Sequence, residues 1–148
     1  MARDAIEYPA GMKISLANDL DEIAAVGARI DEFCESHEIP PQVAYAVNVS
    51  VDELLNNTIS YGYTDGERHT IELSLRLDAD AVVVQIVDDG QEFESSGVPE
   101  PDTEAALEDR AVGGLGLFIV HQMMDRVEFR RVDGRNVVTI AKKTADAP

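Results

Sequence analysis

A carboxylate and an amide side chain lie four residues apart in this sequence, at Glu53 and Asn57. The apolar residues around them repeat with a helical period from about Pro41 to Tyr61, and residues four apart on a helix project from the same side. The two polar groups would therefore face one site. The same spacing is also typical of an ordinary solvated helix face, so the pair alone leaves both interpretations open.

A second polar cluster, Asp88-Asp89-Gly90, directly follows an apolar segment that is typical of a buried strand. Acidic residues and glycine after a strand usually form a turn. A carboxylate at a strand end is also an acceptor-only group that suits the exocyclic amino group of adenine, and Gly90 would let a base approach the backbone. The cluster is compatible with a turn and with an adenine site.

Three glycines, Gly113, Gly114 and Gly116, surround the start of an expected short helix. The first N–H groups of a helix have no partner within it and carry the positive end of the helix dipole, so they can bind phosphate without a lysine. A hinge followed by a helix cap explains the same residues equally well.

The composition limits what such a site can bind. Twelve Lys and Arg against 29 Asp and Glu give the 148 residues a formal charge of −17, which repels a nucleic-acid backbone. ATP is also a polyanion, so a nucleotide site here needs Mg²⁺ and backbone N–H groups. No apolar run approaches the length of a membrane span, no secretion signal is evident, and Cys34 has no second cysteine to pair with, so we expect a cytoplasmic protein.

Hydrophobic periodicity predicts the elements that position these clusters. Strands are expected over residues 12–16, 71–77, 81–87, 127–132 and 136–142, and helical spacing covers residues 20–34, 41–61 and 114–124. Residues 94–113 lack useful periodicity, which predicts a loop with one short helix near 103–108, and a loop of this length is usually functional or disordered. The element order predicts a single α+β domain over residues 1–148, a two-layer sandwich with a mostly antiparallel sheet and helices on one face.

In this order and spacing, the three clusters resemble the asparagine box and the two glycine boxes of the GHKL ATPase superfamily. The resemblance covers residues 12–143. The stretches DELLNN (52–57) and GGLGL (113–117) are similar to those of the anti-sigma-factor serine kinases of the RsbW and SpoIIAB type. The resemblance implies the Bergerat fold, with residues 94–113 as a lid, and this agrees with the layers expected from periodicity.

The resemblance also implies a role for each position. Asn57 would hold Mg²⁺ against the phosphates of ATP, Asp88 would recognise adenine, and Gly90 would make room beside the base. Thr139 on the last strand would support the adenine contact. The phosphates would be wrapped by five consecutive residues, Gly113, Gly114, Leu115, Gly116 and Leu117. Glu53, one helical turn from Asn57, is the expected catalytic residue that orients or deprotonates the attacking hydroxyl.

The function that this resemblance implies is a serine/threonine protein kinase that uses ATP and Mg²⁺. It would phosphorylate a STAS-type anti-anti-sigma partner and sequester a sigma factor or another output protein, and a homodimer is expected. Two alternatives stay open. ATP could order the 94–113 loop and so select a protein partner without catalysis, or the chain could be a detached catalytic domain of a histidine kinase. The last alternative would need a phosphoacceptor histidine from another chain.

Overall fold

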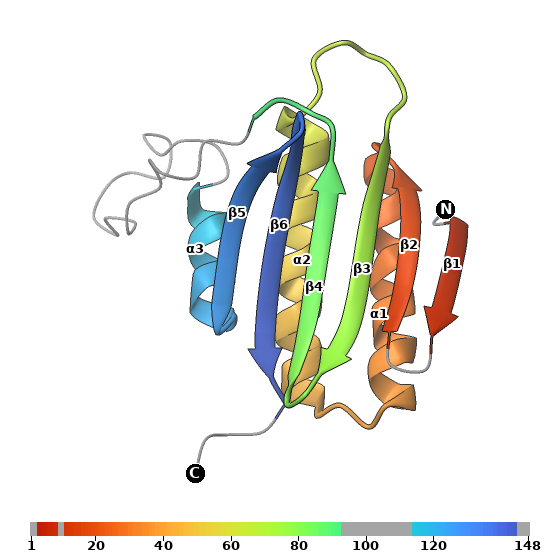
Figure 1. Cartoon of the computed structure of the whole chain (residues 1–148), viewed down its shortest axis with the longest axis vertical. Coiled ribbons are helices and arrows are strands. Elements are labelled where there is room, and N and C mark those ends of the chain that lie inside the picture. Colours follow the sequence, from red (N-terminus) through yellow and green to blue (C-terminus); the bar gives the residue numbers. More distant parts are fainter. Residues whose placement is uncertain (1–2, 9–10, 93–113, 145–148) are drawn as a thin grey trace.

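Six antiparallel strands form one sheet in the computed structural model, which describes residues 3–8, 11–92 and 114–144. The strands lie in the order β1-β2-β3-β4-β6-β5, and every neighbouring pair is antiparallel (Figure 1). Their bounds are β1 (Arg3–Tyr8), β2 (Gly11–Ala17), β3 (Thr70–Asp78), β4 (Ala81–Asp88), β5 (Arg126–Val132) and β6 (Arg135–Lys143).

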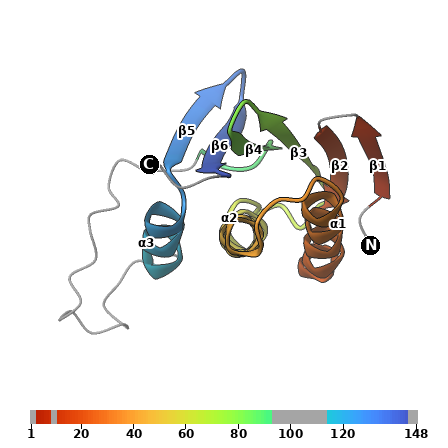
Figure 2. The same cartoon turned by 90° about the horizontal axis from the view of Figure 1, so that it is seen from below.

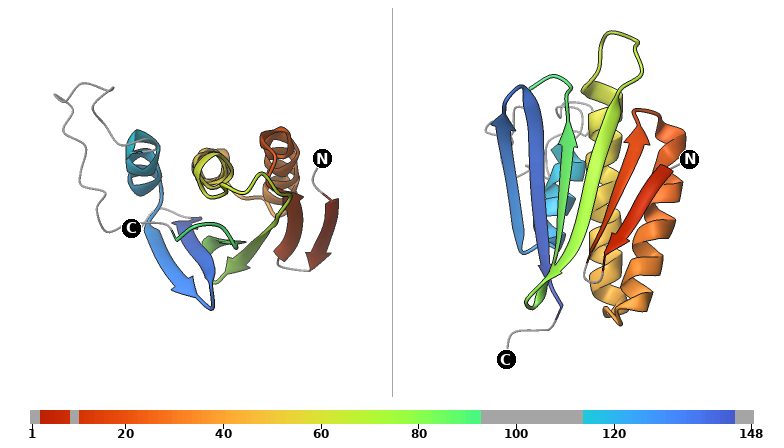
Figure 3. Two further views of the ribbon diagram at one scale, coloured as in Figure 1. Left: turned by 90° about the horizontal axis from the view of Figure 1, so that it is seen from above. Right: turned by 45° about the vertical axis from the view of Figure 1, so that its right-hand side comes forward.

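The helices all lie on one face of this sheet (Figures 2 and 3). They are the 3-10 turn η1 (Leu20–Glu22) and the α-helices α1 (Ile23–Ser36), α2 (Pro41–Tyr61) and α3 (Gly114–Met123). Helix α2 lies between α1 and α3 and contacts both. The predicted two-layer α+β sandwich is therefore confirmed.

The core lies between the two layers and follows from the alternation along the strands. On β3, Ile71, Leu73 and Leu75 are at most 1% exposed, while the residues between them face away from the helices. Val47 and Leu55 of α2 are completely buried against the same sheet face. The middle helix is thus held to the centre of the sheet by apolar contacts along its length.

The ends of α2 agree with the helical period predicted from about Pro41 to Tyr61. Pro41 stands at the first helical position, where its missing N–H is not needed. At the other end, the N–H of Gly62 donates to the carbonyl of Thr58 over 2.8 Å, and Gly62 closes the helix. The C-terminal half of α2 therefore carries Glu53 and Asn57 toward the end of β4.

Most of the predicted elements are confirmed, with two differences. Strand β1 pairs with β2 and was not predicted, because residues 3–8 show no clean alternation of apolar and polar residues. Leu20, where the helical spacing of the first helix was predicted to begin, belongs to η1 and is 50% exposed. The predicted loop over 94–113 and its short helix lie outside the described residues. Within the described ranges, no helix is long and apolar enough to span a membrane.

Candidate functional site

The end of β4 is joined to the end of α2 by backbone contacts. The N–H of Gln91 donates to the carbonyl of Gly62 over 2.7 Å, and the Gln91 side chain donates to the carbonyl of Tyr61 over 3.1 Å. A Cβ at Gly90 would lie 2.5 Å from the carbonyl oxygen of Gly62. Glycine at position 90 is therefore required for the strand end to pack on the helix end, whatever else it accommodates.

Asp88 is the buried carboxylate of this junction and is only 4% exposed. It shares the helix-facing side of β4 with Val84 and Ile86, because side chains alternate along a strand. Its Oδ1 accepts a hydrogen bond from the Gly90 N–H at 2.8 Å and another from Asn136 Nδ2 at 2.9 Å. Both bonds that it accepts from described residues go to the same oxygen, which leaves Oδ2 for a further donor.

The protonation of Asp88 reflects two opposing effects. Burial raises its pKa above the usual value of an aspartate, and the hydrogen bonds from Asn136 and from the Gly90 N–H act in the opposite direction. The nearby Asp89 raises this pKa further, and Arg131 lowers it. The hydrogen-bond donors therefore favour the ionised, acceptor-only form at a position where burial disfavours it.

Asn136 and Arg131 belong to the site and were not predicted from the sequence. Asn136 is the partner of Asp88 in the β4–β6 register, and its Nδ2 also donates to the carbonyl of Gln91 over 2.6 Å. Arg131 Nη1 donates to Asn136 Oδ1 at 3.1 Å and to the carbonyl of Gly90 at 3.0 Å. The pairing of β4 with β6, rather than a local motif, brings these residues to Asp88.

The expected adenine-supporting role of Thr139 is corrected by the same register. Thr139 is the partner of Gln85, whose Nε2 donates to Thr139 Oγ1 over 3.5 Å. Gln85 lies three residues before Asp88 on β4, and Thr139 lies three residues after Asn136 on β6. Because side chains alternate along a strand, the pair Gln85–Thr139 lies on the opposite face of the sheet from the pair Asp88–Asn136. Thr139 therefore faces away from Asp88, and Asn136 holds the place beside that carboxylate.

Asn57 has a buried polar atom that lacks a partner. Its Nδ2 is buried and makes no hydrogen bond with any residue of the described ranges. Leaving such a group unpaired typically costs about 1–3 kcal/mol, and a ligand group that accepts a hydrogen bond from it would remove this cost. Amide oxygens are ligands that Mg²⁺ accepts, and the two ends of an amide are exchanged by a rotation of the side chain. The residue fits a Mg²⁺–phosphate group.

Glu53 lies against the first turn of α3. A Cβ at Gly116 would overlap Oε2 of Glu53, so glycine at this position allows the carboxylate to approach the helix. The backbone N–H groups of that first turn have no partner within the helix. The structure thus brings the predicted catalytic carboxylate to the predicted phosphate-binding segment.

Of the remaining glycine-box residues, the structure describes Gly114, Leu115 and Leu117. The Leu117 side chain is 4% exposed and packs in the core, so only its main chain is available to a ligand. Gly114 and Leu115 have helical backbone within α3. Gly113 lies outside the described residues, so its predicted role in phosphate binding stays a prediction.

Side-chain contacts connect the segment after α2 to Asp89, the residue next to Asp88. Tyr63 stacks on His69 with ring centroids 4.5 Å apart, and the His69 ring lies 2.7 Å from Asp65 and 3.2 Å from Asp89. Burial, followed by the carboxylates of Asp88 and Asp89, raises the pKa of Tyr63 well above its usual value. Hydrogen bonds to Asp65 and then Asp89 raise the pKa of His69. The segment is therefore tied to the residue next to Asp88.

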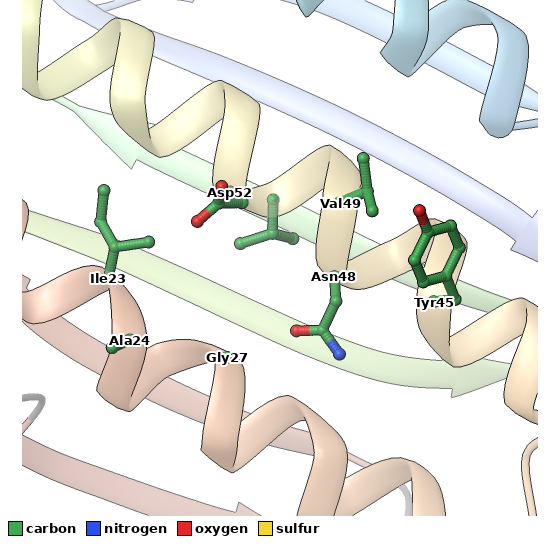
Figure 4. A pocket seen from close by; sticks show the side chains of 8 residues that line it. Ile23, Ala24, Gly27, Tyr45, Asn48, Val49 and Asp52 are labelled. Atoms are coloured by element: carbon green, nitrogen blue, oxygen red, sulfur yellow. The ribbon is translucent and has the colours of Figure 1, made fainter.

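A hollow of about 280 Å³ lies elsewhere, between α1 and α2 (Figure 4). Its lining is mainly apolar and consists of Ile23, Ala24, Gly27, Tyr45, Asn48, Val49, Val51 and Asp52. None of the predicted site residues belongs to this set. The candidate site is accordingly assigned from the hydrogen-bonding chemistry around Asp88, Asn57 and Glu53.

Known proteins resemble this chain over most of its length. Serine/threonine-protein kinase BtrW of Bordetella bronchiseptica is 29% identical over 104 residues, which are 70% of this chain and 73% of that kinase. Serine-protein kinase RsbW of Halalkalibacterium halodurans is 30% identical over 92 residues, which are 60% of this chain and 56% of that kinase. The match thus spans little more than half of the RsbW relative.

Two solved structures share the fold. The RsbU and RsbW domains of a Mycobacterium tuberculosis protein match with a TM-score of 0.65 and 14% identity, covering 93% of this chain and 33% of that one. The Acinetobacter baumannii histidine kinase AdeS matches with a TM-score of 0.50 and 10% identity, covering 89% of this chain and 68% of that one. At these identities the likeness concerns the fold alone.

The family model of the histidine kinase-like ATPase domain matches residues 16–142. This range includes every described residue of the candidate site, from Glu53 on α2 to Asn136 on β6. It also agrees with the resemblance to the GHKL ATPases noted in the sequence. The chain belongs to the family of histidine kinase-like ATPase domains.

Proposed function

We propose that this chain is a protein kinase that binds ATP with Mg²⁺ beside the C-terminal half of α2 and phosphorylates serine or threonine. The observation that carries the proposal is the buried Asp88 carboxylate. Its Oδ1 accepts two hydrogen bonds within the protein, so Oδ2 can accept the exocyclic amino group of adenine. The match to an ATPase family and the names of two relatives, both kinases, support the same activity.

The other groups of the site suit the rest of the nucleotide. The amide oxygen of Asn57 would hold Mg²⁺, and its unpaired Nδ2 would donate to a phosphate. The first-turn N–H groups of α3, within residues 113–117, would hold the other phosphate oxygens. This arrangement suits a chain with a formal charge of −17, because the metal and the backbone dipoles would offset the charge of the phosphates without basic side chains.

Bound MgATP would supply the phosphoryl group that passes to a serine or threonine hydroxyl, leaving ADP. Glu53 would accept and hold the proton of that hydroxyl, because its carboxylate lies beside the first turn of α3. Asn57 would orient the phosphates from one turn further along α2, and the α3 N–H groups would stabilise the charge that develops on them.

The partner that fits this activity is a STAS-type anti-anti-sigma protein. The kinase would also sequester a sigma factor or another output protein, and its working form would be a homodimer. This part of the proposal is supported by the similarity to RsbW and BtrW and to a structure that carries RsbU and RsbW domains. Genes that lie beside the coding sequence offer the candidate partners.

Transfer of labelled phosphate from ATP to a neighbouring STAS protein tests the proposal. We expect a phosphorylated serine or threonine on that protein, and a loss of product with Glu53→Gln. Failure of transfer under conditions where ATP binds would contradict the kinase. Full release of an output protein by a non-hydrolysable ATP analogue, without any phosphorylated product, would identify a non-catalytic switch instead.

A further inference from the structure

The amide of Asn136 has only one orientation that satisfies its neighbours. Its nitrogen must face the carbonyl of Gln91, 2.6 Å away, because a carbonyl can only accept. Its oxygen must face Arg131 Nη1, 3.1 Å away, because a guanidinium can only donate. The same nitrogen then donates to Asp88 Oδ1. The network therefore decides which end of the amide reaches the carboxylate.

Two donors thus occupy one oxygen of Asp88 and leave the other oxygen as an acceptor. The Gly90 N–H and Asn136 Nδ2 reach Oδ1 from the strand end and from the neighbouring strand. Both donors stabilise the ionised carboxylate more than the protonated one, because hydrogen bonds to a charged acceptor are the stronger ones. A ligand group that meets Oδ2 must then be a donor.

Arg131 connects this arrangement to the edge of the sheet. It lies on β5, which is the outermost strand next to β6, and a single nitrogen reaches both Asn136 Oδ1 and the carbonyl of Gly90. Arg131 therefore holds both Asn136 and Gly90, the two residues that donate hydrogen bonds to Asp88. Its neighbour Arg130 faces the other side of the sheet and pairs with Glu128.

We infer that Asn136 and Arg131 are positioning residues that hold Asp88 as an ionised acceptor and so determine the selectivity of the site for a purine that carries an amino group at position 6. The inference rests on the proposed nucleotide binding. A purine with a carbonyl at that position, such as hypoxanthine, would place an acceptor against Oδ2 and be disfavoured.

Binding of ADP and IDP, measured by titration calorimetry, tests this selectivity. The unmodified chain should prefer ADP to IDP. Asn136→Leu removes the amide at similar side-chain volume, so Asp88 loses the charge-assisted hydrogen bond that favours its ionised form. ADP binding should then weaken by about tenfold or more, and IDP binding should change much less. The ratio of the two affinities is the readout, since a general loss of folding would lower both together.

Matched variants control for nonspecific effects. Gln85→Leu makes the same change on the other face of the sheet, and Arg130→Gln is matched to Arg131→Gln on the same strand. We expect the ADP preference to fall in Arg131→Gln and to be retained in both controls. An unchanged ratio in a folded Asn136→Leu chain would overturn the inference. If that variant does not fold, Asn136→Ser and Arg131→Gln are judged by the same ratio.

A second readout does not require nucleotide. The carboxyl carbon of Asp88, followed by NMR titration of the free chain, should show a higher pKa in Asn136→Leu than in the unmodified chain, since a donor to the ionised form is lost. An unmoved pKa would contradict the positioning role. Absence of nucleotide binding by the unmodified chain would instead contradict the proposed function, and the titration would still decide whether Asn136 sets the state of Asp88.

Discussion

The Glu53 carboxylate lies against Gly116, so α2 and α3 meet where a carboxylate faces a residue without a side chain. A Cβ at Gly116 would overlap Oε2 of Glu53. Gly116→Ala should therefore destabilise the fold by about 1–3 kcal/mol in urea unfolding, despite the better helix propensity of alanine. Gly27→Ala in α1 is the matched control, because its Cβ would lie 3.5 Å from Asn48 Oδ1, an ordinary contact.

The cause of that destabilisation can be isolated with a double-mutant cycle. Glu53→Ala removes the overlapping atoms, so adding it to Gly116→Ala should restore about 1 kcal/mol or more relative to the sum of the single changes. Additive effects would mean that the two residues do not contact each other in solution.

Glu53→Gln tests the proposed proton acceptor. The amide keeps the size of the side chain but cannot take a proton, so ADP affinity should stay within about twofold while phosphoryl transfer falls by about 100-fold or more. Asp52→Asn, an exposed neighbour on the same helix, should leave both quantities unchanged. Full transfer by Glu53→Gln with intact binding would remove Glu53 from the mechanism.

Asp88→Asn should reverse the base preference. The Gly90 N–H and Asn136 Nδ2 require an acceptor in the place of Oδ1, so the new amide would direct its oxygen there and its NH₂ toward the ligand. A donor in that position favours a carbonyl, so ADP binding should fall and IDP binding should rise relative to it. Calorimetry with the two nucleotides measures this, and an unchanged preference for ADP would contradict the assignment of Asp88.

The same substitution should alter how stability depends on pH. Because burial raises the folded-state pKa of Asp88, the contribution of this group is complete below its unfolded-state pKa and is lost as pH rises through the folded value. Asp88→Asn should therefore gain stability relative to the unmodified chain as pH rises from about 4 through the folded-state pKa of Asp88. The prediction would be wrong if the free energies of unfolding of the two chains, measured in urea, differed by the same amount at every pH.

His69 should stabilise the fold more in acid than in base. Its hydrogen bonds to Asp65 and Asp89 raise its folded-state pKa above 6.5, so its contribution is complete below that value and is lost as pH rises through the folded-state pKa. The stability difference between the unmodified chain and His69→Gln should then be larger at about pH 5.5 than at about pH 8.5. A difference that is constant with pH would show that the ion pairs do not form in solution.

The fold could be predicted from the sequence to the extent that local signals specify it. Helix α2 begins at Pro41 and ends before Gly62 because both residues act on their immediate neighbours. Strands β3 and β4 alternate clearly because one face is buried. Strand β1 escaped prediction because it pairs at the sheet edge without a clean pattern of its own.

The site was less predictable where it depends on pairing between distant strands. Asp88 and Asn136 are 48 residues apart, and only the β4–β6 register makes them neighbours. Thr139, the residue predicted to support the adenine contact, lies three positions after Asn136 on β6. Residues an odd number of positions apart on a strand have side chains on opposite faces of the sheet. Glu53 and Asn57 were found because a helix relates them locally, whereas the contact of Glu53 with Gly116 required the packing of α2 on α3.

Titration calorimetry of the folded chain with MgATP tests whether Asp88 and Asn57 form a nucleotide site. We expect saturable binding at one site per chain, which Asp88→Asn weakens and which Asn57→Ala makes insensitive to Mg²⁺. Heat-silent titrations with both ATP and ADP on folded protein, or binding that both substitutions leave intact, would contradict a nucleotide site at Asp88 and Asn57.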